Sequence, residues 1–358
     1  MPFDPDAAAQ PGAGIFGLPE NAADAGVVLV PVPFDATTSY RRGTAGGPRA
    51  VFEASMQVDL FDPRLGRVYE RGIVMQPEDA KIRRANAEAR RAADPIIARG
   101  GVEPDAPVPA SVRRSLAKVN AACERVNEIV DARVSEILEA GRVPGVLGGE
   151  HSVPFGAIRA VARRFPGVGI LHVDAHMDLR EAFEGFAWSH ASIMHNVLTR
   201  LAGVAHVVQV GIRDFGERER AFALEQGSRV RVWYDHELAE ALLEGERWSV
   251  LAAKIIRSLP RQVYVSFDID ALDPSLCPHT GTPVPGGLSF HQASLLLEAL
   301  RASGRTVVGF DLVEVAPGAK GSPEWDANVG ARVLYKLCGL AGSVEPTGRR
   351  RAGGRPAR

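Results

Sequence analysis

The sequence has little cysteine and no excess of charge of either sign. Its three cysteines, Cys123, Cys277 and Cys338, lie far apart and form no CxxC pair, so neither a disulfide framework nor a thiolate zinc site is expected. The 42 basic and 43 acidic residues leave a formal net charge of -1, which gives no electrostatic basis for binding nucleic acid or an anionic membrane surface. Any electrostatic basis for function must therefore be local.

Long apolar runs are also missing. No run of about 18 apolar residues occurs anywhere in the chain. The first residues, MPFDPDAAAQPGAG, lack the basic and then apolar regions of a signal peptide. We therefore expect a cytoplasmic protein that binds neither nucleic acid nor membrane. The 46% hydrophobic and 24% charged residues match an average soluble globular protein, so a substantial core is expected.

Apolar segments alternate with segments of helical periodicity along most of the chain. After a first strand at 27–32 and a short helix from about residue 48, strands are expected near 143–147, 168–173, 206–211, 230–233, 262–269 and 306–312. Helices are expected near 152–165, 191–201, 216–226, 238–258, 289–303 and 326–340. This alternation predicts an α/β fold with three layers, α/β/α, around a mostly parallel central sheet.

The remaining segments suggest how the chain is divided. Residues 1–26 are expected to form an N-terminal arm, and residues 27–340 a single α/β domain. Within that domain the charged, proline-flanked segment at about 60–110 is interpreted as an excursion with one solvated helix. A long helix from Val112 should end at Gly141, which is placed as a C-terminal cap. The basic residues 341–358 are expected to be a disordered tail.

Side chains of the types that can bind metals follow the ends of three predicted strands. In chain order they are Glu150, His151, Asp174, His176, Asp178, Asp268 and Asp270. The spacing of two within DAHMD (174–178) would place its three ligand-type side chains on one face of an extended chain. Because ligands bind at the carboxyl ends of strands in open α/β sheets, these residues are expected to meet at one edge.

Four aspartates and two histidines of this set form an oxygen-rich cluster without sulfur. Two divalent metal ions would nearly balance the four carboxylates, whose mutual repulsion would otherwise favour protonation. This donor set favours Mn²⁺, with Ni²⁺, Co²⁺ and Fe²⁺ as alternatives. A single Asp or His near a strand end is more often a cap, and a lone DxHxD segment would be structural roughly half the time. The coincidence of two such clusters favours a metal site.

These motifs resemble those of the ureohydrolases, the family of arginase, agmatinase, guanidinobutyrase and formimidoylglutamase. The segments GGEHS (148–152), DAHMD (174–178) and SFDIDALDP (266–274) are similar to the signature blocks of the family, in the same order. Three further segments are similar to agmatinase-like members: 33–43, 281–288 and 311–317. The resemblance covers most of 27–55 and 143–340, and it implies the arginase-like fold.

The resemblance also implies roles for individual residues. One metal would be bound by His151, Asp174, Asp178 and Asp268, and the other by Asp174, His176, Asp268 and Asp270. A hydroxide that bridges the two ions would attack the guanidine carbon. Asp178 would carry a proton, His190 would act as the proton shuttle, and Glu314 would bind the guanidinium group. Relatives commonly form trimers or hexamers, so a homo-oligomer is expected.

Alternatives remain open for several of these residues. His190 could be an ordinary buried or surface histidine, and Ala191 stands where the family usually has glycine. Glu314 could be a solvated salt-bridge partner. His172 is interpreted as supporting Asp174 or the core and not as a seventh ligand.

The substrate is less specified than the reaction. Agmatine is the first choice, with guanidine, 4-guanidinobutyrate or another ω-guanidino compound as alternatives. Arginine is disfavoured because LREAFEGFAW (179–188) replaces the Asn- and Ser/Thr-rich sequence of arginases. Formimidoylglutamase activity is also less favoured. A catalytically silent relative that only binds metal or ligand is the non-enzyme alternative.

Overall fold

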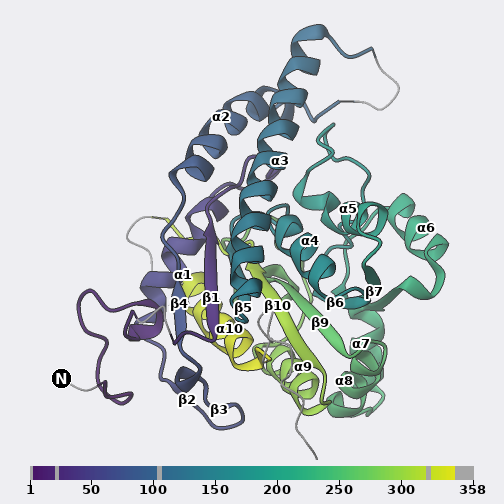
Figure 1. Cartoon of the computed structure of the whole chain (residues 1–358). Coiled ribbons are helices and arrows are strands. Elements are labelled where there is room, and N and C mark those ends of the chain that lie inside the picture. The colour runs from purple at the N-terminus through teal and green to yellow at the C-terminus, as the bar shows by residue number, and fades with distance from the viewer. Residues whose placement is uncertain (1–2, 21–23, 103–106, 320–323, 343–358) are drawn as a thin grey trace, which may run out of the picture.

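The computed structural model describes residues 3–20, 24–102, 107–319 and 324–342. An eight-stranded sheet runs through the centre of these residues (Figure 1), and every pair of neighbouring strands is parallel. Its strands are, in spatial order, β4 (Ile73–Met75), β1 (Val27–Val32), β5 (Val143–Gly148), β10 (Thr306–Val313), β9 (Gln262–Asp268), β6 (Val168–Val173), β7 (Val204–Ile212) and β8 (Val230–Tyr234).

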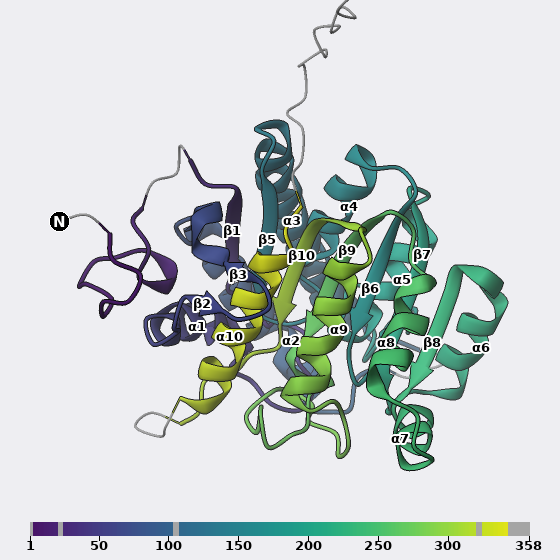
Figure 2. The same cartoon turned by 90° about the horizontal axis from the view of Figure 1, so that it is seen from below.

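Helices cover both faces of the sheet (Figure 2). One face carries α2 (Ala80–Ile97), α3 (Ala110–Glu139), α4 (Phe155–Arg164) and α5 (Ile193–Arg200). Each of these helices packs against the next one along the chain. The other carries α1 (Gly47–Ser55), α10 (Trp325–Leu340), α9 (Phe290–Ala302) and α8 (Trp248–Arg257). The predicted α/β/α layering is confirmed. Among the described residues, no helix combines the length and apolar character needed to cross a bilayer.

The register of the central strands brings the predicted site residues together. Val173 of β6 pairs with Phe267 of β9, and Val313 of β10 pairs with Asp268 at the end of β9. On its other side β10 pairs with β5. The carboxyl ends of β5, β10, β9 and β6 therefore lie in a row, and each is followed directly by residues of the predicted site.

Local signals explain the ends of several helices. Gly141 has φ 76°, its N–H donates to Leu138 O, and the N–H of Arg142 donates to Ile137 O. This is the Schellman arrangement, so the predicted cap at Gly141 is confirmed. Ser289 and Gln292 form a capping box at the start of α9.

Two predicted segments differ from the structure. Residues 60–110 contain a hairpin of β2 (Phe61–Asp62) and β3 (Gly66–Arg67), and also β4, an edge strand of the main sheet that the sequence did not predict. The helix in this segment, α2, is not fully solvated, because a stripe that includes Ala85, Ala89 and Ala93 is buried. Most of the predicted tail lies outside the described residues.

The single helix predicted at 238–258 is wrong. It is two helices, α7 (Asp235–Leu243) and α8, and Gly245 between them has φ 93°. Glycine adopts this left-handed region without the steric cost of a Cβ, so the chain turns there. A further helix, α6 (Glu217–Glu225), lies close to the predicted position.

Candidate metal centre

The predicted site residues meet in one cavity of about 160 Å³ at the carboxyl edge of the sheet. Its lining includes seven of them, His151, His176, Asp178, His190, Asp268, Asp270 and Glu314. The eighth, Asp174, is fully buried and contacts two of the lining histidines. The structure therefore brings together every residue to which the sequence assigned a metal or catalytic role.

His151 faces three carboxylates. Its Nδ1 lies 3.0 Å from Oδ2 of Asp174, 3.0 Å from Oδ2 of Asp268 and 3.2 Å from Oδ2 of Asp178. No acceptor among the described residues meets this nitrogen with hydrogen-bond geometry. Its Nε2 lies 2.9 Å from the hydroxyl of Ser266, which donates to Asp311. The hydrogen of the neutral ring is therefore placed on Nε2, and the Nδ1 lone pair points toward the carboxylates.

A second group of donor atoms adjoins the first. His176 Nδ1 lies 3.2 Å from Oδ2 of Asp270 and 3.5 Å from Oδ1 of Asp174. Asp174 thus faces His151 with one oxygen and His176 with the other. The potential ligand atoms form two groups that share Asp174: one is His151, His172, Asp174 and Asp178, and the other is Asp174, His176 and Asp270. Asp268 faces the first group through Oδ2, while its Oδ1 accepts the N–H of Asp270 at 2.9 Å.

The electrostatics of this cluster require added positive charge. Burial, and then the charge of Asp174, raises the pKa of Asp178 well above its usual range. Burial and the neighbouring Asp270 do the same to the pKa of Asp268. Burial opposes a charge on His151, yet the contacts with Asp174 and Asp268 raise the pKa of its imidazole. Two divalent cations would supply the charge that protons supply otherwise, so these residues fit a two-metal centre.

His172 supports Asp174 from behind the cluster. Its Nε2 lies 2.8 Å from Oδ2 of Asp174, and the amide of Gln209 donates to its Nδ1 at 2.9 Å and to Met177 O at 2.7 Å. With Nδ1 as an acceptor, Nε2 carries the hydrogen and donates to Asp174. Burial lowers the pKa of His172, which favours this neutral form. These contacts suit the predicted supporting role, and His172 also belongs to the first group of potential ligand residues.

The backbone is strained at two residues of the site. Asp178 has φ 55° and Glu314 has φ 60°, a left-handed conformation that costs a non-glycine residue about 1–3 kcal/mol. Hydrogen bonds hold both residues: Asp178 O accepts the N–H of Met194, and Glu314 N–H donates to Gly149 O. The sequence predicted an extended chain through Asp178. In the structure the backbone turns at this residue instead.

Glu314 and His190 lie in the same cavity. Oε1 of Glu314 accepts the main-chain N–H of His151 at 2.8 Å, and burial, then the neighbouring Glu150, raises the pKa of Glu314. A Cβ on Gly281 would lie 3.2 Å from Oε2, so glycine leaves room beside this oxygen. Burial, and then the nearby His176, lowers the pKa of His190 to about 3, which favours a neutral ring.

Sequence reasoning gave no role to several residues around the cavity. Asp214, Arg180 and Glu219 line it, and Arg180 pairs with Glu219 at 3.3 Å. Thr37 contacts His190 from the loop after β1. Two signals were available: Asp214 follows the end of β7, and Thr37 belongs to segment 33–43, whose resemblance to agmatinase-like members was noted. Cys277 is buried and not a nucleophile candidate, because burial raises the pKa of its thiol.

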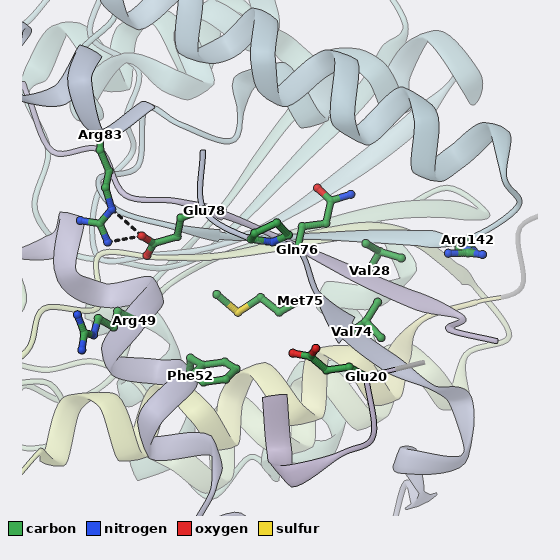
Figure 3. A pocket seen from close by; sticks show the side chains of 11 residues that line it. Glu20, Val28, Arg49, Phe52, Val74, Met75, Gln76, Glu78, Arg83 and Arg142 are labelled. Atoms are coloured by element: carbon green, nitrogen blue, oxygen red, sulfur yellow. Dashed lines mark hydrogen bonds and ion pairs between the residues drawn. The ribbon is translucent and has the colours of Figure 1, made fainter. Parts of the chain in front are cut away.

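A larger hollow of about 680 Å³ runs along the edge strand β4, away from the cluster (Figure 3). Val28, Val74 and Met75 are among the apolar side chains that line it, and Glu78 at its rim is paired with Arg83. Its lining contains no histidine or cysteine and only two carboxylates, so it resembles no metal or catalytic site.

The fold and the cluster define a class, the metal-dependent hydrolases with three α/β/α layers, whose active site is rich in carboxylates and imidazoles and lies at the carboxyl edge of a parallel sheet. Residues 25–339 match the model of the arginase family. The chain is 33% identical over 319 residues to an N(1)-aminopropylagmatine ureohydrolase of Thermus thermophilus, covering 89% of this chain and 91% of that protein. It belongs to the arginase family, whose members are binuclear metal hydrolases.

Other relatives agree with this assignment. An agmatinase of Bacillus anthracis is 33% identical over 292 residues, with 81% of this chain and 83% of that protein covered. The arginase of Bacillus cereus superposes with a TM-score of 0.64 at 25% identity, covering 87% of this chain and 98% of that one. The proclavaminate amidino hydrolase of Streptomyces clavuligerus has a TM-score of 0.70 at 24% identity, covering 93% and 98% of the two chains, a likeness of fold alone.

Proposed function

We propose that this enzyme hydrolyses the guanidino group of a small cationic guanidino compound, releasing urea and an amine, with agmatine as the first-choice substrate. The single observation that carries the proposal is the shared cavity. In it, two groups of metal-ligand atoms joined by Asp174 lie beside His190 and beside the buried carboxylate of Glu314.

The resemblance to the ureohydrolases suggests which residues would hold the metals. His151, Asp174, Asp178 and Asp268 would hold one ion, and Asp174, His176, Asp268 and Asp270 the other. Two divalent ions held there would lower the pKa of a bound water molecule toward neutrality. The excess of carboxylates over imidazoles favours Mn²⁺, with Ni²⁺ as the main alternative.

The protein's own side chains bind the substrate and move protons. Oε1 of Glu314 is taken by His151, so Oε2 is the oxygen left to accept hydrogen bonds from a guanidinium group. The carboxylate of Asp178 accepts the proton of the attacking water. His190, neutral in its resting form, would relay this proton from Asp178 to the departing amine.

Charges around the cavity support a cationic substrate. Arg180 is balanced by Glu219, whose carboxylate also accepts the N–H groups of Leu179 and Gly216. Asp214 is exposed, and its carboxylate has no ion-pair partner within the described parts of the chain. This carboxylate suits the ammonium group of agmatine. Arg180 favours a second candidate, 4-guanidinobutyrate, whose carboxylate could displace Glu219 as its partner.

A panel assay tests the proposal. Metal-free protein loaded with Mn²⁺, and separately with Ni²⁺, is assayed for urea release from agmatine, 4-guanidinobutyrate, guanidine and arginine, and for ammonia from formiminoglutamate. The highest kcat/KM is expected for agmatine. If no compound is turned over with either metal, the catalytically silent alternative replaces this proposal.

Three further expectations are part of the proposal. We propose that residues 27–340 form one domain, that the enzyme is cytoplasmic, and that it assembles as a homotrimer or homohexamer. Light scattering after size-exclusion chromatography measures the assembly directly, and a monomer would contradict the expectation.

A further inference from the structure

The loop after β1 places Thr37 between the buried carboxylate of Glu150 and the partly buried ring of His190. Thr37 is itself buried. It lies in segment 33–43, which contributes neither a proposed metal ligand nor the proposed guanidinium-binding residue. We propose that Thr37 is a positioning residue for His190, whose hydroxyl fixes the ring hydrogen on Nδ1 and leaves Nε2 as the proton acceptor. The inference rests on the proposed function insofar as His190 acts as the proton shuttle.

The hydrogen of the Thr37 hydroxyl is used by Glu150. Thr37 Oγ1 donates to Oε1 of this fully buried glutamate at 2.9 Å. The main-chain N–H of Thr37 donates to Oε2 at 2.7 Å, and Ser152 Oγ donates to Oε1 at 2.6 Å. Three donors converge on Glu150, so its carboxylate acts as an acceptor.

With its only hydrogen committed, Thr37 Oγ1 can only accept on its other side. It accepts the main-chain N–H of His190 at 3.1 Å and lies 3.4 Å from the Nδ1 of the same residue. Ser189 Oγ, which accepts the N–H of Ala191 at 3.2 Å, flanks Nδ1 at 3.3 Å. A hydrogen on Nδ1 satisfies the contact with Thr37, and Ser189 Oγ can accept it as well. A lone pair on Nδ1 could accept only the hydroxyl hydrogen of Ser189 and would face the lone pairs of the Thr37 hydroxyl.

The position of this hydrogen has a catalytic consequence. A neutral imidazole can accept a proton only at the nitrogen that has no hydrogen. With Nδ1 protonated, that nitrogen is Nε2. The ring is held further by Phe183, whose ring lies 5.9 Å from that of His190 in an edge-to-face arrangement. Loss of the Thr37 hydroxyl would free His190 to adopt the other tautomer, in which Nε2 accepts no proton.

Three variants separate positioning from folding. Thr37→Val removes the hydroxyl and keeps the branched shape, and Thr37→Ser restores a hydroxyl. Thr44→Val is the matched control, because Thr44 is a buried threonine of the same region whose hydroxyl has no hydrogen-bond partner within the described residues. Each metal-loaded protein is compared with wild type for metal content, kcat and KM on the best substrate of the panel.

We expect Thr37→Val to bind two ions per chain with nearly unchanged KM and a kcat lowered roughly 10- to 100-fold, part of the usual contribution of general acid–base catalysis. Thr37→Ser should recover most of that loss, and Thr44→Val should behave as wild type. A kcat of Thr37→Val within about twofold of wild type would overturn the proposal. So would a loss of metal from Thr37→Val, or a Thr37→Ser variant as slow as the valine.

A second measurement does not depend on the substrate. In protein labelled with ¹⁵N-histidine and loaded with diamagnetic Zn²⁺, the His190 signals are identified by their loss in His190→Asn. Wild type and Thr44→Val should show hydrogen on Nδ1, and Thr37→Val should shift toward hydrogen on Nε2. If wild type carries hydrogen on Nε2, or if Thr37→Val matches wild type, the inference fails even where urea is released. If the tautomer shifts as expected and no urea is released, the proposed function fails instead.

Discussion

The main-chain N–H of His151 donates to Oε1 of Glu314 at 2.8 Å, across 163 residues of sequence. His151 was predicted to bind metal, and Glu314 was predicted to bind the guanidinium group of the substrate. This contact fixes the separation between the proposed metal ligand and the proposed guanidinium-binding carboxylate. Oε2 of Glu314 is left free to face the cavity. It exists because β5 and β10 are neighbours in the sheet and end at the same edge.

Asp174 is the residue shared by the two groups of ligand atoms, so its replacement should affect both metals. We expect Asp174→Ala to retain fewer than two ions per chain and to lose activity to the level of metal-free protein. Elemental analysis and urea release measure the two effects. Asp59→Asn, at an exposed position outside the cavity, is the control. An Asp174→Ala protein that keeps both metals and turns over would contradict the arrangement.

Glu314→Gln keeps an acceptor for the N–H of His151 but removes the negative charge. A hydrogen bond to a charged group contributes ~1.5–3 kcal/mol, so kcat/KM should fall about 10- to 100-fold. Metal content should not change, because Glu314 is not among the potential ligands. Unchanged kcat/KM in steady-state assays would remove Glu314 from substrate binding.

Asp214→Asn tests whether the cavity recognises a cationic tail. The kcat/KM for agmatine should fall about fivefold, as expected for an exposed ion pair of ~1 kcal/mol. Guanidine has no tail, so its kcat/KM should stay the same and serves as the internal control. Equal losses for both compounds would place Asp214 in the chemistry or in the fold. No loss for either would place the ammonium group elsewhere.

Removal of the metals should make stability depend on pH in a defined direction. The pKa of Glu150 is raised from 4.5 to about 7 by burial, and those of Asp178 and Asp268 are also raised. A raised pKa means that the folded state holds its protons more tightly than the unfolded state, so stability is lost as pH rises through the folded pKa. The Tm of EDTA-treated protein should therefore fall between about pH 5 and 8.

Bound metal should reverse much of this loss. Metal binding requires deprotonated carboxylates, so protons compete with the ions at low pH. The difference in Tm between loaded and metal-free protein should grow from about pH 5.5 to 8, as measured by calorimetry. A difference that shrinks with rising pH would show that the cluster is not the metal site.

The sequence predicted the parts of the molecule that depend on local patterns. Alternating apolar strands and helices define the sheet, and the aspartates and histidines after strand ends could be assigned to one edge. The strand β4 was missed because it consists of only three residues, Ile73–Met75. So short a segment cannot show the alternation of apolar and polar residues that identifies a strand. Gly245 interrupts a helical pattern that continues on both sides, so α7 and α8 were merged.

The site was predictable in its members but not in its geometry. The left-handed backbone of Asp178 and Glu314 depends on tertiary hydrogen bonds to Met194 and Gly149, which no local pattern encodes. Thr37 reaches His190 across 153 positions of sequence. Such contacts arise only when the sheet has brought the loops together.

A metal titration tests the central claim most directly. Metal-free protein is titrated with Mn²⁺ while urea release from agmatine, or from the best compound of the panel, and bound metal are measured together. Activity should rise with bound metal and reach its plateau at two ions per chain. Urea release without metal, a plateau at one ion, or no release from any guanidino compound at full loading would contradict a two-metal guanidino hydrolase.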